Sequence, residues 1–136
     1  MTIMVKVGAT KERKIVVNQN QSTSFLWEGE NVFSTPSMIS EMEETCRLLL
    51  KEQFIPEREW DSVGTFVEIK HLAVTPVGAE VLLKAKVYSV NERRVMFDVD
   101  ASDKIEKIGE GRHERVIIDI SRFRGRFDEK KNKLEI

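Results

Sequence analysis

The sequence predicts an α+β fold in which one long helix packs on an antiparallel β-sheet. Three features predict this class: a helical pattern over residues 36–54, a strand-like segment before it, and a series of strand-like runs after it. The later strands alternate Val, Leu and Ile with Lys, Glu and Arg. This alternation is typical of a sheet with one solvated face and one face covered by the helix.

The helix has a clear start signal. Ser34 or Thr35 can cap it, and Pro36 suits the first helical position. Apolar residues then recur at steps of three and four, which places them on one face of a helix. They are Met38, Ile39, Met42, Cys46, Leu49 and Leu50.

Three acids lie within this helical segment. Glu43 falls beside Ile39 and Met42 at the margin of the apolar stripe, whereas Glu41 and Glu44 fall farther round the helix. We therefore expect Glu43 to be the semi-buried acid of the three. Without further information, an exposed helix carboxylate is the ordinary alternative.

The strand predictions follow from β-branched and alternating segments. A first strand is predicted near residues 11–18, and residues 19–33 are predicted as a polar, irregular segment with an apolar cluster at Phe25, Leu26 and Trp27. Four later strands are predicted over residues 63–75, 79–90, 94–103 and 104–120. A five-turn helix wrapped by a curved antiparallel sheet of about five strands is the hotdog arrangement, although composition alone allows other α+β folds.

The length and composition bound the class of protein. The chain has 136 residues, which fits a single domain spanning residues 1–136, with a disordered tail expected from about residue 128. Its 22 basic and 23 acidic residues give a net charge of −1, so the composition predicts neither a nucleic-acid nor a membrane partner. Cys46 is the single cysteine, which excludes an internal disulfide and any Cys-based metal site. No apolar stretch approaches membrane-spanning length, and we expect a cytoplasmic protein.

The chain has two histidines, His71 and His113, and strand alternation predicts which way His71 faces. On the alternation of the predicted strand, His71 lies with Val67, Ile69 and Ala73 on the face toward the helix. A core histidine bonded to the backbone is the alternative for His71. His113 is expected to be structural or exposed.

Three segments together resemble the hotdog-fold thioesterases, in the fluoroacetyl-CoA thioesterase branch: VFSTPSMISEMEETC, VGTFVEIKHLAVTPVGAEV and IEKIGEGRHERVIID. The resemblance covers about residues 32–123. It implies a homodimer with active sites at the dimer interface, an acyl-CoA substrate, and hydrolysis to free acid and CoA. It places catalytic roles on Thr35, Glu43 and His71, and substrate-binding roles on Gly64 and Arg115. No cluster of His, Asp and Glu has metal-ligand spacing, so we expect no metal or cofactor.

These residue types suit thioester hydrolysis, which needs a nucleophile, a base and stabilisation of the oxyanion. Thr35 is either the nucleophile or a group that orients water, and it also suits a simple helix cap. Gly64 is either a bulge glycine or an opening for the thioester beside the backbone. Arg115 is either a ligand of phosphate or acyl group, or a surface arginine paired with an acid.

The segment before Thr35 departs from the family pattern. It is shorter, Gly29 lies near the expected position of a lid aromatic residue, and Pro36 and Ser37 replace a small residue and an aromatic one. We therefore expect a small or medium acyl group and no strong preference for fluoroacetyl-CoA. A non-catalytic acyl-CoA or small-ligand binding protein on the same fold is the alternative function, and the pairing of two dimers into a tetramer stays open.

Overall fold

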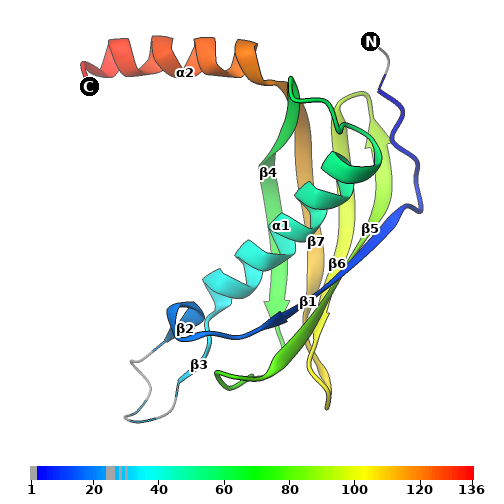
Figure 1. Ribbon diagram of the computed structural model, residues 1–136, viewed down its shortest axis with the longest axis vertical. Helices are drawn as coiled ribbons and strands as arrows, with labels where there is room; N and C mark the ends of the chain where they lie inside the picture. Colours follow the sequence, from blue (N-terminus) through cyan, green and yellow to red (C-terminus); the bar gives the residue numbers. More distant parts are fainter. Residues whose placement is uncertain (1–2, 24–26, 28, 30) are drawn as a thin grey trace.

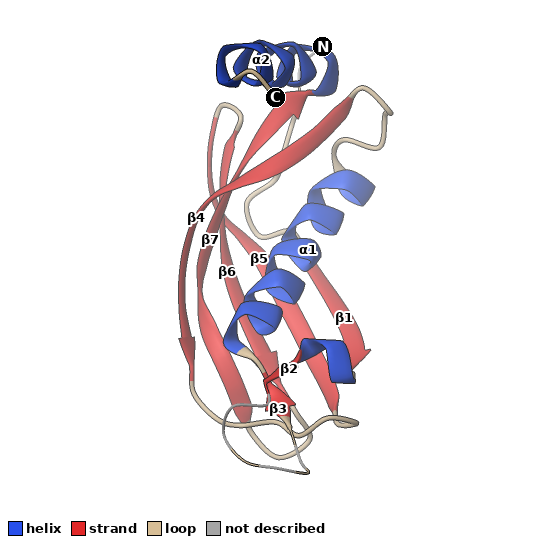
Figure 2. Cartoon of the chain, turned by 90° about the vertical axis from the view of Figure 1, so that its left-hand side faces the viewer, coloured by secondary structure: helices blue, strands red, loops and turns tan. Residues whose placement is uncertain are grey.

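The computed structural model describes residues 3–23, 27, 29 and 31–136. It contains one long helix, α1 (Thr35–Gln53), packed across a curved five-stranded antiparallel sheet (Figures 1 and 2). The sheet order is β1-β5-β6-β7-β4. Its strands are β1 (Thr10–Val16), β4 (Trp60–His71), β5 (Glu80–Asn91), β6 (Arg94–Ser102) and β7 (Lys107–Asp119). The predicted α+β hotdog class is confirmed.

Helix α1 begins and packs as its sequence predicts. The Ser34 hydroxyl accepts a hydrogen bond from the Ser37 backbone at 3.2 Å, and Pro36 occupies the first turn. Such a cap is worth about 1 kcal/mol. Five of the six predicted stripe residues are buried, and Ile39 is half-buried at the edge. The buried five are Met38, Met42, Cys46, Leu49 and Leu50.

The sheet face under α1 is lined by alternate residues of the central strands. In β5 these are Val81, Leu83, Ala85 and Val87, and in β6 they are Val95, Phe97, Val99 and Ala101. The antiparallel register places Phe97 beside Val87 on one side and beside His113 of β7 on the other. The core is therefore formed between α1 and this concave face.

Strand β4 is an open edge of the sheet. Its backbone pairs with β7 on one side, and the order of the strands leaves the other side without a neighbour among the described residues. Trp60 and Ser62 are buried, whereas residues 64–68 are exposed, including Phe66 and Val67 at 46% and 42%. The pairing shifts by one residue between Gly64 and Phe66, which is a β-bulge at Thr65.

Two segments differ from the sequence expectation. The polar segment before α1 contains a 3-10 turn, η1 (Gln19–Gln21), and a small two-stranded sheet of β2 (Ser22–Thr23) and β3 (Val32–Phe33). Backbone pairing with β3 and the capping of η1 by Asn18 order this region locally. Of its predicted apolar cluster, Phe25 and Leu26 lie outside the described residues, and Trp27 is 49% exposed.

The expected disordered tail is instead helical. Helix α2 (Ile120–Leu134) follows β7 and extends away from the sheet (Figure 1). Asp119 caps its first turn by accepting from the Arg122 backbone, and Glu129 pairs with Lys133 one turn later at 3.4 Å. The prediction of disorder rested on the high charge of this segment, whereas its helix cap and its pairs at helical spacing favour a helix. Neither described helix is long and apolar enough to cross a membrane.

Candidate active site

Thr35 and His71 form the closest pair among the predicted site residues. Thr35 is the first residue of α1, and His71 is the last residue of β4. The Thr35 Oγ1 and His71 Nδ1 atoms are 2.7 Å apart. The helix start and the strand end therefore join a hydroxyl and an imidazole that are 36 residues apart in sequence.

The orientation of His71 agrees with the predicted face of the strand. His71 pairs with Gly109 of β7, and a side chain at Gly109 would collide with Met38 of α1. The ring therefore lies on the face that α1 covers. Its Nε2 atom is buried and has no hydrogen-bond partner among the described residues.

Burial lowers the pKa of His71 below its ordinary 6.5, partly opposed by the backbone at Ala73. The imidazole is thus neutral at pH 7. When Nδ1 accepts the Thr35 proton, Nε2 carries the hydrogen and is free to donate. In this arrangement Nδ1 can act as a base toward Thr35 while the Nε2–H is available to donate to another group.

An apolar crevice opens beside this pair. Its volume is about 420 Å³. It is lined by Thr35, Pro36 and His71, and by apolar residues of two flanking segments. The apolar residues are Val32, Phe33, Leu72, Ala73 and Val74. The crevice is large enough for a small or medium acyl chain.

Glu43 lies in a second group, deeper along α1. It is eight residues after Thr35, which corresponds to about 12 Å along the helix axis. Its Oε1 atom lies 3.0 Å from the point where a Cβ at Gly64 would sit. The Glu43 side chain is 39% exposed, close to the 40% of Glu44, whereas Glu41 is the most buried of the three at 19%, so the expectation that Glu43 is the semi-buried acid is wrong.

Glu41 and Glu44 have other partners. Glu41 pairs with Arg13 at 3.2 Å, and Glu44 pairs with Arg47 at 2.9 Å. Both acids are therefore held in ion pairs on the flanks of α1. Glu43 is the acid of the three that faces the β4 edge beside Gly64.

Behind Glu43 lies a buried pair of β7 side chains. Arg115 is 6% exposed and donates to the Ser62 hydroxyl and carbonyl, each at 2.7 Å. His113 is 1% exposed, and its Nδ1 bonds the Phe66 carbonyl at 2.8 Å. Because a carbonyl only accepts, Nδ1 carries the hydrogen and Nε2 accepts from Arg115 at 3.2 Å.

This pair fixes the backbone of β4 on both sides of the bulge. Arg115 donates to the Ser62 carbonyl and His113 donates to the Phe66 carbonyl. Gly64 and Thr65 therefore lie between two residues whose backbone is fixed by these hydrogen bonds. Burial lowers the pKa of His113, which agrees with a neutral ring. Of the two expectations for His113, structural or exposed, the structure supports the structural one. The His113 Nε2 lies 4.0 Å from Glu43, a contact that strand alternation alone did not reveal.

Within one chain, the candidate residues therefore form two groups. Thr35 and His71 meet at the crevice, whereas Gly64 and Arg115 lie with Glu43. Thr35, Glu43 and His71 therefore do not come together inside a single chain, and their expected meeting across a dimer interface stays a prediction. In the described part of the chain, no three His, Cys, Asp or Glu residues could hold a metal ion.

Comparison with known proteins decides the family. Residues 4–121 match the family described as FlK, fluoroacetyl-CoA-specific thioesterase. The chain belongs to this family. A fluoroacetyl-CoA thioesterase from Streptantibioticus cattleyicolor is 34% identical over 133 residues, which cover 93% of this chain and 94% of that protein.

Solved structures agree with this FlK-family membership. The fluoroacetyl-CoA thioesterase FlK superposes with a TM-score of 0.84 at 30% identity, covering 93% of this chain and 98% of that one. A thioesterase-superfamily protein of Thermus thermophilus superposes with a TM-score of 0.86 at 25% identity, covering 97% of each chain. The chain is thus a homologue of thioester hydrolases, and α2 lies almost wholly beyond the matched family region.

The lowered pKa of His71 predicts the acid side of the pH profile. Because the base must be neutral, kcat/KM should rise with pH through the lowered pKa and level off below pH 6.5. We expect this in thioester hydrolysis measured between about pH 5 and 8, with circular dichroism at each pH to exclude acid unfolding. A rise centred above pH 6.5 would contradict His71 as the base.

Proposed function

We propose that this protein is an acyl-CoA thioesterase that acts as a homodimer on small or medium acyl groups. The observation that carries the proposal is the 2.7 Å contact between Thr35 and His71 at the mouth of an apolar crevice. Family membership supports the reaction class. FlK has been crystallised in variant forms with fluoroacetate and CoA and with acetyl-CoA.

The proposed site combines residues of two protomers. From Gly64 to its last residue, His71, the β4 edge is exposed or half-buried, whereas Trp60 and Ser62 are buried. Antiparallel pairing of this stretch with its own copy is self-complementary, and it places Gly64 opposite His71 of the partner subunit. Because Glu43 sits against Gly64, its carboxylate then faces the Thr35–His71 pair across the interface.

The proposed chemistry has two stages. His71 Nδ1 takes the Thr35 proton while Oγ1 bonds the thioester carbonyl carbon. The C–S bond breaks, and the CoA thiolate takes the proton from His71. Water then attacks the threonyl ester, giving one proton to Glu43 of the partner subunit. Thr35 leaves the acyl carbon, recovers that proton, and the free acid departs.

Further groups beside the proposed site suit stabilisation of the developing charge and entry of the substrate. The His71 Nε2–H is a donor beside the reacting carbonyl, where negative charge develops, and the dipole of α1 favours that charge at the helix start. Gly64, without a side chain, leaves room for the carbonyl and water beside Glu43. Arg115 places a buried positive charge behind this carboxylate, with its guanidinium bonds directed to Ser62 and His113.

A thiol-release screen tests the function. We expect CoA release from short and medium acyl-CoAs, and no strong preference for fluoroacetyl-CoA over plain acyl-CoAs, because the segment before Thr35 departs from the family pattern. Thermal stabilisation by acyl-CoA without thiol release would instead indicate a binding protein. Strong selectivity for fluoroacetyl-CoA would contradict the expected specificity while leaving the reaction class intact.

A further inference from the structure

Helix α2 presents an apolar face that the rest of its own chain does not cover. None of its residues is buried, and Phe123, Phe127 and Leu134 are 44%, 56% and 57% exposed. These residues follow Ile120 at steps of three, four and seven, so they share one side of the helix. An aromatic stripe of this length left in water is unusual for a monomer.

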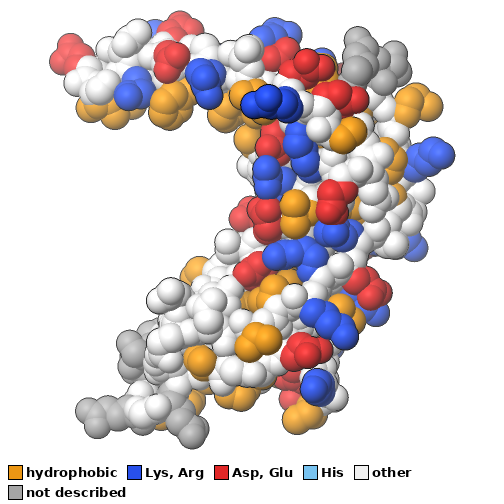
Figure 3. Space-filling model, viewed as in Figure 1, with side chains coloured by type: hydrophobic (Ala, Val, Ile, Leu, Met, Phe, Trp, Pro, Cys, Tyr) orange, Lys and Arg blue, Asp and Glu red, His pale blue; other side chains and the backbone are white. Residues whose placement is uncertain are grey.

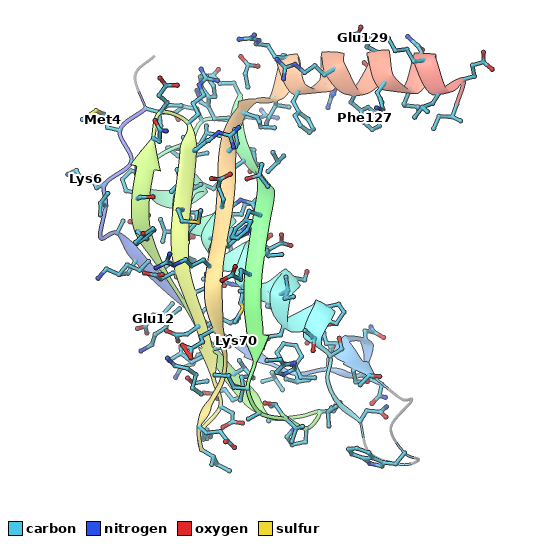
Figure 4. All side chains as sticks on the ribbon, turned by 180° about the vertical axis from the view of Figure 1, so that it is seen from behind. Met4, Lys6, Glu12, Lys70, Phe127 and Glu129 are labelled. Carbon is cyan, nitrogen blue, oxygen red and sulfur yellow. The ribbon has the colours of Figure 1, made fainter. Side chains whose placement is uncertain are left out.

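This apolar face borders a hollow. Figure 3 shows an open space between α2 and the body, with hydrophobic side chains along the side of α2 that faces it. Figure 4 shows Phe127 pointing toward the body side of α2 and Glu129 pointing away from it. Strand β4 and α1 lie on the opposite side of the hollow (Figure 1). Two uncovered features of the molecule, the β4 edge and the α2 stripe, thus border one space.

We infer that this hollow holds a second copy of the chain, and that α2 packs its apolar stripe over the crevice of the partner subunit. This inference extends the homodimer of the proposed function and rests on its β4 pairing. Pairing of two copies about a two-fold axis covers the β4 edge of both copies at once, whereas an unrelated peptide would cover only one edge.

The register gives the position of α2 on the partner. Asp119, immediately before α2, pairs with Trp60 at the start of β4. If Gly64 opposes His71 of the partner subunit, then Trp60 lies opposite Thr75 of the partner subunit. Helix α2 therefore starts beside the partner's crevice, and it extends outward past the β4 edge in Figure 1.

The crevice offers a matching surface. Two of its lining residues, Leu72 and Val74, are 48% and 69% exposed in the single chain. Helix α2 is about 22 Å long, enough to cross this opening. Docking would cover apolar surface on both sides and make the crevice deeper. It would also bring Arg126, Lys130 and neighbouring cations near the site that receives a polyanionic CoA.

Photocrosslinking tests this placement in the full-length protein. Phe127→p-benzoylphenylalanine places the photoreactive group on the apolar face, and Glu129→p-benzoylphenylalanine is the matched control on the opposite face. We expect a covalent dimer from the first variant at least about tenfold more abundant than from the second. Mapping in a mixture of light and isotope-heavy chains should join residue 127 to residues 32–36 or 71–74 of the other chain.

Several outcomes would overturn the inference. They are crosslinks within one chain only, equal dimer yields from positions 127 and 129, or no covalent dimer at all. The basic and aromatic composition of α2 also suits an anionic membrane. Flotation with vesicles of phosphatidylcholine and phosphatidylserine that is lost in Phe127→Glu, without the covalent dimer, would reject the second copy in favour of lipid. Thiol release by wild-type protein with no crosslink would reject only the α2 placement and leave the proposed function intact.

Discussion

Glu43→Gln and His71→Ala are each expected to lower kcat/KM for acyl-CoA hydrolysis by about 100- to 10,000-fold. The amide cannot accept the proton of water, and alanine removes the base that lies 2.7 Å from the Thr35 hydroxyl. Both sites are exposed or half-buried and outside the main core, so the unfolding midpoint should change little. Full turnover by both variants would show that the chemistry lies elsewhere.

Mixing these two inactive variants tests whether the site is shared. In a mixed dimer, one site receives intact His71 from one chain and intact Glu43 from the other, while the second site receives neither. After subunit exchange of equal amounts, random pairing should restore about a quarter of wild-type activity. A control mixture of Glu43→Gln with wild type should show no such gain above dilution. If the double-variant mixture stays inactive after proven exchange, all catalytic groups act within one chain.

Gly111→Ala is expected to give the largest loss of stability of any small substitution considered. A Cβ at this position would overlap the carbonyl oxygen of Glu68 and lie 2.9 Å from the Cα of Ile69. These are backbone atoms of the adjacent β4, so no side-chain rotation relieves the contact. Because the strands must separate locally, we expect a loss of about 3 kcal/mol or more in urea unfolding.

Gly125→Ala supplies the matched control for this change. Gly125 lies in exposed helix α2, and a Cβ there meets nothing within 4 Å. Alanine is favoured over glycine in a helix by about 1 kcal/mol, so this variant should keep or slightly raise the unfolding midpoint. An unchanged midpoint for Gly111→Ala would mean that β4 and β7 approach less closely than the structure indicates.

The periodicity of the sequence was sufficient to predict α1 and the main strands. A stripe at helical spacing and a Ser-Thr-Pro start predicted the helix within one residue of its observed ends. Alternation placed His71 on the face of β4 toward α1, next to Gly109. Both predictions depend on local geometry, which repeats every few residues and is written into the order of side chains.

The C-terminal segment shows where charge content misleads. Its lysines, arginines and acids predicted a disordered tail, yet the segment forms α2. The signal was present in the cap at Asp119 and in the apolar steps from Ile120 to Leu134. The stripe of Ile120, Phe123, Phe127 and Leu134 lies among many charged residues, so composition alone favoured disorder over a helix.

His113 and Arg115 show what residue spacing cannot supply. Both occupy alternate positions of β7 and look like members of a charged surface strand. Only the pairing of β7 with β4 brings them onto Ser62 and Phe66, about fifty residues earlier. Their burial depends on α1 closing over that face, which is a property of the assembled layers.

The sequence by itself determined the fold class, the boundaries of the helix, and the faces of the strands, because these depend on the periodic placement of apolar side chains. Tertiary structure alone decided that Thr35 meets His71 while Glu43 stands about two helical turns away against Gly64. The physical reason is that strand register and the crossing of α1 over the sheet set distances between residues far apart in the chain. No local pattern of side chains specifies those distances.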